Sequence, residues 1–444
     1  MRVTIVAANT FEFDSRFLRT ATTLAGEGHE VTILGWSGPG LPGREPLAGG
    51  VELVRLAVDR RISTALRPLP AGVRALLLRL TGLPPDVEVL PPERPQGLDR
   101  LRHPLRRTLE VVANVRRAGP WTEAVLEAAP TTDVFHAQSL ICLPVVREAA
   151  RRVGGRFVYD VADYHTEAAR LARMPWLVRE LARRRERAWA RDAAAFLAVS
   201  DPVAELVARR WDVARPAVLL NCPPAWRPDE PGPIASDLIR GATGLAQGRP
   251  IVLYQGGFSV DRGVEELVAA ASQPTLTDLG AAIVFMCYGR LEDFLREAAR
   301  SHPDRIWVLP AVPPDELMPW TASADVAFVG QPPRTLNQQM NLPNKLFESI
   351  MAGVPVVVSV GNEQCRLVSV EGVGRCVDVD EPSAIAAACA ELISRSSEER
   401  QRLRAHCRSV ALARYTWEHA ATGLLDSYRR LEPGPRPQTA GALA

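Results

Sequence analysis

The chain has 444 residues, of which 47% are hydrophobic, and this length is too great for one hydrophobic core and predicts two domains or three. The formal net charge of +2 argues against a polycation that binds nucleic acid. No apolar run reaches the ~18 residues that a membrane span needs, and the opening stretch MRVTIVAANTFEFD turns acidic too early for a signal peptide. We therefore expect a cytoplasmic protein.

Short apolar runs rich in Val, Ile and Leu alternate along the chain with segments of helical period. The first series is RVTIVAAN, EVTILGW, RFVYDVAD, AAFLAVS and PAVLLN, and the second is IVLYQGG, AIVFMCYG, IWVLPAV, VAFVGQ and VPVVVSV. Continuous apolar strands that are each followed by a helix predict parallel sheets covered by helices on both faces.

The second series begins after the Pro-rich stretch CPPAWRPDEPGPIASD, which has the composition of a linker. The sequence thus predicts an α/β protein with two Rossmann-like, doubly wound domains, residues 1–225 and 235–415, that face a cleft. Ligands of such sheets bind beyond the carboxyl ends of the strands.

Two regions depart from this pattern. Residues 58–118 are rich in Arg, Pro and Leu and predict an insertion with basic amphipathic helices. Such helices can lie on anionic lipid or cover a groove; in the alternative, Leu faces the domain and Arg faces water. Residues 433–444 have the composition of a disordered tail.

The seven cysteines form no CxxC pair and are scattered through apolar surroundings. This distribution predicts reduced core residues, with neither a disulfide nor a zinc framework.

Lys345 is the only lysine in the chain, and a compact ammonium differs from guanidinium in being a small, rotatable point charge. In its segment, NLPNKLFESIMAGVPVVVS, we expect Asn341 or Asn344 to cap a helix of about two turns that ends at Gly353. Lys345 and Glu348 then share one helix face. The helix start and the ammonium form an anion site, and Glu348 faces a hydroxylated group such as a ribose. The alternative is a surface ion pair.

A Gly-rich turn follows the first strand of the second domain in YQGGFSVDRGVEELVAA. Gly256 and Gly257 allow a ligand to approach the backbone closely, and Arg262 precedes the next helix, where it suits a phosphate. With Lys345, this gives two cations at the carboxyl edge of one sheet, as a nucleotide diphosphate requires.

Four segments together resemble the GT-B glycosyltransferases of the large retaining family four, which use nucleotide sugars. They are NLPNKLFESIMAGVPVVVS, YQGGFSVDRGVEEL, VPPDELMPWTASADVAFV and YTWEHAATGLLDSYRRL. The form PNKLFE resembles that of a subgroup of these enzymes. The likeness runs from DSRFLRTATTLAGEGHEVTILG to the last helix and leaves out mainly residues 58–118.

The resemblance implies roles for individual residues. Arg262 and Lys345 would neutralise the donor diphosphate without a metal or another cofactor, and Glu348 would hold the ribose. The helix at 416–432 would return to the first domain. Two departures concern the second domain: Met340 stands in place of the first glutamate of a paired-glutamate motif, and Gly257 in place of a common Arg.

In the first domain, DVFHAQSL has Gln138 where many relatives have a second His, and VYDVADYHTE has Ala162 and Asp163 where relatives often have His-Glu. We expect His136 to donate to the donor sugar or the leaving oxygen; the alternative is a buried structural residue. Arg16 either shapes the acceptor loop with Asp14 or forms an internal ion pair.

The expected site residues fall into three groups. The catalytic residues are Arg262, Lys345 and His136. The donor-binding residues are Gly256, Gly257, Gly289, Asn344 and Glu348. The acceptor-side residues are Asp14, Arg16, Gln138, Asp163 and Glu167. No metal site is expected.

The predicted function is retaining transfer of a sugar from a nucleotide diphosphate sugar to a hydroxyl or other nucleophile of a small-molecule, saccharide or lipid-linked acceptor. Front-face attack, guided by the leaving phosphate, follows from the resemblance. The alternatives are a nucleotide-sugar epimerase or hydrolase on the same fold and a degenerate, non-catalytic scaffold. Peripheral membrane contact through residues 58–118 is a further expectation.

Overall fold

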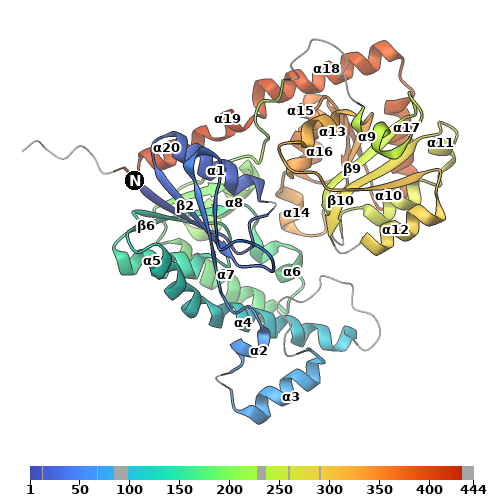
Figure 1. The fold of residues 1–444 in the computed structure, drawn as a ribbon. Helices are drawn as coiled ribbons and strands as arrows, with labels where there is room; N and C mark the ends of the chain where they lie inside the picture. The colour runs from blue at the N-terminus through green and yellow to red at the C-terminus, as the bar shows by residue number, and fades with distance from the viewer. Residues whose placement is uncertain are drawn as a thin grey trace, which may run out of the picture.

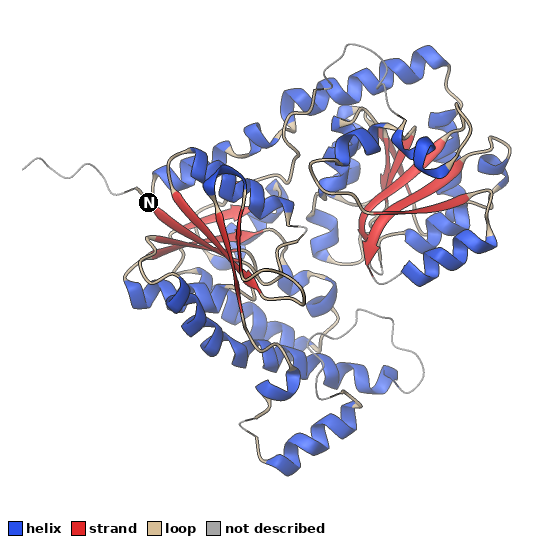
Figure 2. Cartoon of the chain, in the orientation of Figure 1, coloured by secondary structure: helices blue, strands red, loops and turns tan. Residues whose placement is uncertain are grey.

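The computed structural model describes residues 1–12, 14–67, 69–84, 99–227, 237–258, 261–289 and 292–432. It has two sheets, each flanked by helices on both faces (Figure 1, Figure 2). The predicted α/β class with two Rossmann-like domains is confirmed. Three of the predicted regions lie wholly or partly outside the described residues. They are the linker at 228–236, the insertion at 68 and 85–98, and the tail at 433–444.

The first sheet has the strand order β3-β4-β2-β1-β5-β6-β7-β8, and its paired strands are parallel except for β3 and β4. The strands are β1 (Arg2–Val6), β2 (Glu30–Trp36), β3 (Arg44–Pro46), β4 (Glu52–Leu56), β5 (Val134–Ala137), β6 (Arg156–Val161), β7 (Ala195–Ala198) and β8 (Ala217–Val218). The helices are α1 (Ser15–Gly26), η1 (Ala48–Gly50), α2 (Ile62–Ala65), α3 (Ala71–Thr81), α4 (Asp99–Ala128), α5 (Leu143–Val153), η2 (His165–Glu167), α6 (Ala169–Ala172), α7 (Trp176–Ala190) and α8 (Asp201–Trp211).

The second sheet has the order β11-β10-β9-β12-β13-β14, with all paired strands parallel. The strands are β9 (Ile251–Phe258), β10 (Ala282–Gly289), β11 (Ile306–Pro310), β12 (Val326–Val329), β13 (Val356–Ser359) and β14 (Gly374–Val377). The helices are α9 (Leu238–Thr243), α10 (Val264–Ala270), α11 (Pro274–Thr277), α12 (Glu292–Ser301), α13 (Leu317–Ala322), α14 (Leu336–Met340), α15 (Asn344–Met351), α16 (Glu363–Glu371), α17 (Pro382–Ile393) and α18 (Ser397–Arg414), followed by α19 (Trp417–Ala420) and α20 (Thr422–Arg429).

Both faces of each sheet are apolar because successive strand residues point to opposite faces. Val6 and Leu34 lie in one hydrophobic cluster, whereas Ile5 and Ile33 lie in another. This double burial explains why the strands read as continuous apolar runs.

The last two helices lie against the first sheet rather than the second (Figure 1). Trp417 donates from Nε1 to Thr23 Oγ1 at 2.7 Å, and Trp417, Leu424 and Tyr428 belong to the hydrophobic cluster of the first sheet. The described chain therefore returns from the second domain to the first at its last two helices.

The region 58–118 does not end as expected, because α4 continues to Ala128. Trp121 and Val125 lie in the hydrophobic cluster of the first sheet. Because these residues are buried, the helix continues beyond the expected boundary at residue 118. On α3 the leucines do not all face the domain, since Leu76 and Leu80 are 54% and 51% exposed. No described helix is long and apolar enough to cross a membrane.

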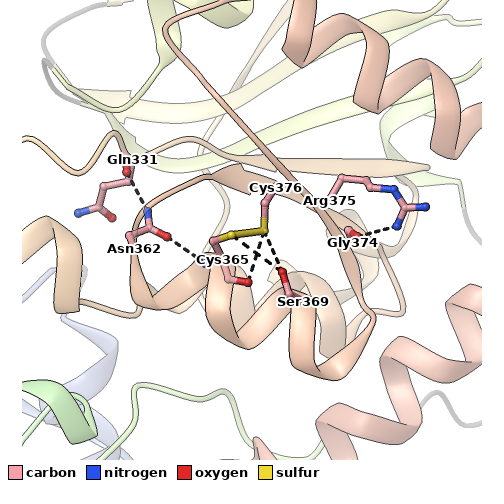
Figure 3. The surroundings of a disulfide bond; sticks show 7 residues. All are labelled: Gln331, Asn362, Cys365, Ser369, Gly374, Arg375 and Cys376. Carbon is pink, nitrogen blue, oxygen red and sulfur yellow. Dashed lines mark hydrogen bonds between the residues drawn. A yellow bond between two sulfur atoms is a disulfide. The ribbon is translucent and has the colours of Figure 1, made fainter.

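The cysteine prediction is wrong for one pair. Cys365 on α16 and Cys376 on β14 form a disulfide (Figure 3), while the other five cysteines are free and buried. The packing of α16 against β14 brings the two Cα atoms to 5.5 Å, a separation that a disulfide can bridge. The sequence spacing carries no sign of this contact.

Candidate active site

A cavity of about 420 Å³ lies between the two domains and is lined by residues from both. Asn9, Asp14, Gln138 and Asp163 are among those from the first domain, and those from the second are Arg262, Asn341, Leu342, Pro343 and Asn344. A neighbouring cavity of about 290 Å³ shares Asn9, Asp14, Asn221 and Asn344 and adds Tyr288. Several of these residues follow the carboxyl ends of strands, where doubly wound sheets bind ligands.

Helix α15 begins at this cavity without a side-chain cap. Its N-cap is Pro343, which cannot supply one, so the prediction that Asn341 or Asn344 caps the helix is wrong. Asn344 instead accepts a hydrogen bond from Asn221 and lies 3.5 Å from Ser15. The first backbone N–H groups of α15 therefore have no capping side chain, which is the arrangement that binds anions. Gly353, at φ +75°, ends the segment as expected.

The ammonium of Lys345 lies over the ring of Tyr254, 4.0 Å from its centroid. Among the described residues it has no hydrogen bond or ion pair. Burial, followed by the nearby Arg262 guanidinium, lowers the pKa of Lys345 to about 7. When protonated, the side chain is thus a cation without an ion-pair partner, and it can bind an anionic ligand.

Glu348 does not form the ion pair with Lys345 that was the alternative interpretation. Its carboxylate accepts from Gln255 Nε2 at 3.1 Å, and Gln255 is in turn fixed by Thr321, which donates to it at 2.7 Å. Burial raises the pKa of Glu348. The carboxyl is therefore hydrogen-bonded by a neutral amide, with the charges of Arg19 and Lys345 opposing the rise in its pKa, and it retains capacity to accept from a hydroxyl.

Arg262 is displayed by a tight turn. Asp261 and Gly263, on either side of it, both have φ +69°, and Arg262 Nη1 donates to Gln331 Oε1 at 3.2 Å. Arg262 lines the interdomain cavity and affects the pKa of Lys345. The two expected cations therefore act at one place.

The three glycines expected at the donor site end neighbouring strands. Gly256 has φ +88° and Gly289 φ +131°, conformations that favour glycine. A Cβ on Gly257 would meet the Tyr288 ring at 3.3 Å. None of the three lines the two cavities described above, although all lie at the same sheet edge.

Asp14, Gln138 and Asn9 form one hydrogen-bonded wall in the first domain. Asp14 accepts from the backbone N–H of Phe17 at 3.4 Å, from Asn9 Nδ2 at 2.8 Å and from Gln138 Nε2. Burial raises the pKa of Asp14. Asn9 and Gln138 are held in place at the cavity through this carboxylate.

Arg16 is bound mainly inside the domain. It forms a buried ion pair with Asp160 at 2.8 Å and donates to the backbone oxygen of Leu219 at 2.8 Å. The internal ion pair was one of the two interpretations, but its partner is Asp160 rather than Asp14. Arg16 borders the cavity with its charge already neutralised.

The structure contradicts the placement of His136 at the reacting atoms. His136 is fully buried; its Nδ1 lies 2.9 Å from the hydroxyl of Tyr428 and its Nε2 3.7 Å from Asp160. It points into the layer beneath α1 and α20, whereas Gln138, two residues on, lies beyond the end of β5 and lines the cavity. The burial of His136 agrees with the alternative, a buried structural histidine.

Glu167 is likewise displaced from the acceptor side. Its carboxylate pairs with Arg179 at 3.1 Å, Arg183 at 2.5 Å and Arg210 at 3.0 Å, and it lines neither cavity. The basic run of α7 attracts this carboxylate away from the cleft.

Asp163 lies where the two domains meet. Its Oδ1 accepts from Asn337 Nδ2 at 2.9 Å and from Asn341 Nδ2 at 2.8 Å, and the backbone N–H of Tyr164 donates to Asn337 at 2.8 Å. Asp163 also lines the cavity. It therefore joins the domains as well as facing the cleft.

Met340, which stands where the paired-glutamate motif has its first glutamate, lies away from the cavities. It is 9% exposed and packs in the hydrophobic cluster of the first domain, while its backbone oxygen accepts from Ser200 Oγ at 2.7 Å. The α14 segment is thus docked on the first domain, and Met340 lines neither cavity.

Sequence reasoning missed Asn9, Asn221, Gln331 and Asn337. The first three follow the apolar runs RVTIVAA, PAVLL and VAFVG, so the rule that ligand residues follow strand ends would have found them. No local signal marks Asn337. Among the described residues no group of three or more His, Cys, Asp or Glu is placed to hold a metal ion.

The architecture, with two doubly wound domains and a cavity between their strand ends, is the GT-B fold. Residues 249–395 match the family model described as Glycosyl transferases group 1. Over 218 residues, 46% of this chain and 54% of the other, the chain is 26% identical to the alpha-maltose-1-phosphate synthase of Mycolicibacterium smegmatis. It thus spans about half the length of this curated relative. Most of the second domain is thus similar to group 1 glycosyl transferases.

Solved structures share the whole architecture. The sucrose-phosphate synthase of Thermosynechococcus elongatus has a TM-score of 0.67 at 16% identity, covering 97% of this chain and 99% of that one. Anabaena HepE in complex with UDP-glucose has a TM-score of 0.63 at 14% identity, with 97% and 100% covered. An E. coli protein bound with UDP-2-fluoro glucose has a TM-score of 0.65 at 12% identity, with 98% and 100% covered. At these identities the likeness concerns the fold.

Proposed function

We propose that this protein is a retaining glycosyltransferase that moves a sugar from a nucleotide diphosphate sugar to an acceptor hydroxyl. The observation that carries the proposal is the position of Arg262, which lines the interdomain cavity beside the uncapped start of α15 and lies near enough to Lys345, in the first turn of that helix, to lower its pKa. Cations and N–H groups fixed in place stabilise the charge that grows on a departing diphosphate. The protein's own cations do this, so the transfer needs neither a metal nor another cofactor.

The other donor contacts follow from this placement. Glu348, held by Gln255, accepts from a ribose hydroxyl. The acceptor approaches the same face of the sugar that the diphosphate leaves, and the leaving phosphate takes its proton, as in similar retaining enzymes. UDP is the first nucleotide to test, because two structures of similar fold contain UDP-sugars.

The acceptor binds on the first-domain side of the cavity. Asn9, Gln138 and Asp163 present amide and carboxylate groups there, a set that suits hydroxyls. Among the described cavity residues, Arg16 is neutralised by Asp160 and Arg262 is assigned to the diphosphate. We therefore favour an uncharged, hydroxyl-rich acceptor, either a free saccharide or small molecule or the sugar of a lipid-linked one.

A cytoplasmic enzyme with peripheral membrane contact through residues 58–118 is part of the proposal. Val73, Leu76 and Leu80 are exposed on α3, on the same helix as Arg74 and Arg79. Vesicle co-sedimentation with anionic and neutral lipid, with Leu76→Ser as the variant, tests this part separately.

The principal experiment measures thermal unfolding with UDP, GDP, TDP and ADP, each without added metal. A nucleotide at ~100 times its Kd adds about 2.7 kcal/mol of stability, which is readily seen. We expect one nucleotide to stabilise the wild type and the exposed-site control Arg402→Ala but not Lys345→Met, which keeps the apolar stem over Tyr254. Turnover of the matching sugar nucleotide should then fall by about 100-fold or more in Lys345→Met.

Other outcomes favour the alternatives. Consumption of the sugar nucleotide without an acceptor would indicate an epimerase or hydrolase. Nucleotide binding without turnover on any acceptor would indicate a non-catalytic scaffold, and equal activity of Lys345→Met and the wild type would refute the assignment of Lys345.

A further inference from the structure

The guanidinium of Arg262 is held by a neutral amide rather than by a carboxylate. Gln331 Oε1 accepts from Arg262 Nη1 at 3.2 Å, and no other hydrogen bond or ion pair joins Arg262 to the described residues. The adjacent carboxylate, Asp261, is engaged by Arg173 and by Arg334. Arg262 therefore has an oriented side chain whose charge is not neutralised.

Gln331 is itself fixed at each of its hydrogen-bonding backbone groups. Its N–H donates to Ser359 Oγ at 2.9 Å, and its carbonyl oxygen accepts from Asn362 Nδ2 at 3.0 Å. Its side-chain Oε1 accepts a second hydrogen bond, from Gln364 Nε2 at 3.1 Å. Gln331 is 3% exposed and Gln364 is fully buried, so the amide has little freedom to rotate.

The support beneath Gln331 is anchored at the start of α16. Asn362 caps this helix by accepting from the N–H of Cys365 at 2.9 Å, and Cys365 is tied to β14 by the disulfide with Cys376 (Figure 3). A Cβ on Gly330 would lie 3.2 Å from the backbone oxygen of Arg262 and 2.3 Å from Phe328. Glycine at this position thus brings Gln331 close beneath the Arg262 turn.

The amide orientation follows from chemistry, because a guanidinium only donates and Gln331 must present its oxygen to it. A carboxylate at this buried position would form a charge-assisted pair with Arg262 and neutralise it. An amide oxygen orients the same group and leaves its charge available.

We propose that Gln331 is a positioning residue that orients Arg262 while preserving its charge for the diphosphate of the donor. This inference rests on the proposed function and deepens it: a neutral amide supports Arg262, just as the neutral ring of Tyr254 supports Lys345.

The test compares Gln331→Glu with Gln331→Met by calorimetric titration of the nucleoside diphosphate that stabilises the wild type. Glutamate is nearly isosteric with glutamine, so a merely structural role predicts that it is the milder change. We expect the opposite, with affinity lowered by about tenfold or more in Gln331→Glu and by less in Gln331→Met. Affinity for the parent nucleoside, which lacks the diphosphate, should be unchanged when followed by ligand-observed NMR.

Gln339→Glu is the matched control, because Gln339 is exposed on α14 and undergoes the same chemical change. If Gln331→Glu does not fold, the Arg262→Met and Gln331→Met double-mutant cycle decides, since Gln331 should have no further effect once Arg262 is absent. Additive effects of the two substitutions in this cycle would overturn the inference about Gln331 but not the proposed function. The same holds if Gln331→Glu binds the nucleoside diphosphate as tightly as Gln331→Met does. A wild type that binds none of the four nucleoside diphosphates would overturn the proposed function and this inference together.

Discussion

The ammonium of Lys345 rests on the ring of Tyr254, 4.0 Å from its centroid. Tyr254 is fully buried on β9, so the only lysine of the chain rests on an aromatic face and, among the described residues, forms no ion pair, although the charge of Glu348 also favours its protonated form. Cation–π attraction compensates part of the cost of burying a charge. This relationship makes the protonation of Lys345 sensitive to an incoming anion.

Nucleoside diphosphate affinity should therefore depend on pH through Lys345. The pKa of Lys345 in the empty protein is about 7, and a bound diphosphate raises it. Above pH 7 the empty protein has released a proton that the complex keeps, so affinity falls as the pH rises from 7 to 9, by up to about tenfold per pH unit. Below pH 7 this group adds no further dependence.

Calorimetric titration in buffers of different ionisation enthalpy should show proton uptake on binding at pH 8. Lys345→Arg is the control, because arginine remains protonated throughout this range. The same pH slope and proton uptake in Lys345→Arg would assign them to another group.

Met340→Glu should not restore a sugar contact. The Met340 side chain is buried in the hydrophobic cluster of the first domain, where a carboxylate has no described cationic partner. We expect the free energy of unfolding to fall by about 3 kcal/mol or more, against less than about 1.5 kcal/mol for Met340→Leu. Denaturant unfolding measures both, and a gain in turnover in Met340→Glu would show that this position reaches the donor.

His136 should matter for stability rather than for chemistry. Tyr428→Phe removes its 2.9 Å contact with His136 and should cost about 1 kcal/mol without changing turnover. His136→Gln should lower the melting temperature and keep turnover within about threefold, because His136 has no surface in the cavity. A folded His136→Gln protein with turnover reduced a hundredfold or more would return His136 to the catalytic residues.

The disulfide should contribute measurable stability. It joins residues 11 apart, and closing a loop of this size is worth about 2–3 kcal/mol in the chain-entropy model. We expect dithiothreitol to lower the melting temperature of the wild type to that of the Cys365→Ser, Cys376→Ser double variant and to leave the variant unchanged. The bond would be excluded if dithiothreitol left the melting temperature of the wild type unchanged and the unfolded, unreduced wild type had two more titratable thiols than the double variant.

The sequence predicted the fold because its determinants are local. Apolar strands alternating with helical segments allow only parallel sheets buried on both faces, and the Pro-rich stretch divides them into two series. The same logic placed Arg262 and Lys345 at one edge, since Arg262 lies in the turn between a strand and its helix, and Lys345 lies in the first turn of the helix that leads into the next strand of the sheet. Their joint position is seen in the structure, whereas their roles remain predictions.

The tertiary structure decided which of the other polar residues reach the cavity. His136 and Gln138 are two residues apart, yet the first is covered by Tyr428, 292 positions away, and the second lines the cleft. Ion pairs with three arginines hold Glu167 away from the cavity, and Met340 is buried against the opposite domain. Cys365 bonds to Cys376 because a helix packs on a strand. Each outcome depends on tertiary contacts between different helices, strands and loops. Neither the periodicity nor the composition of the sequence encodes these contacts.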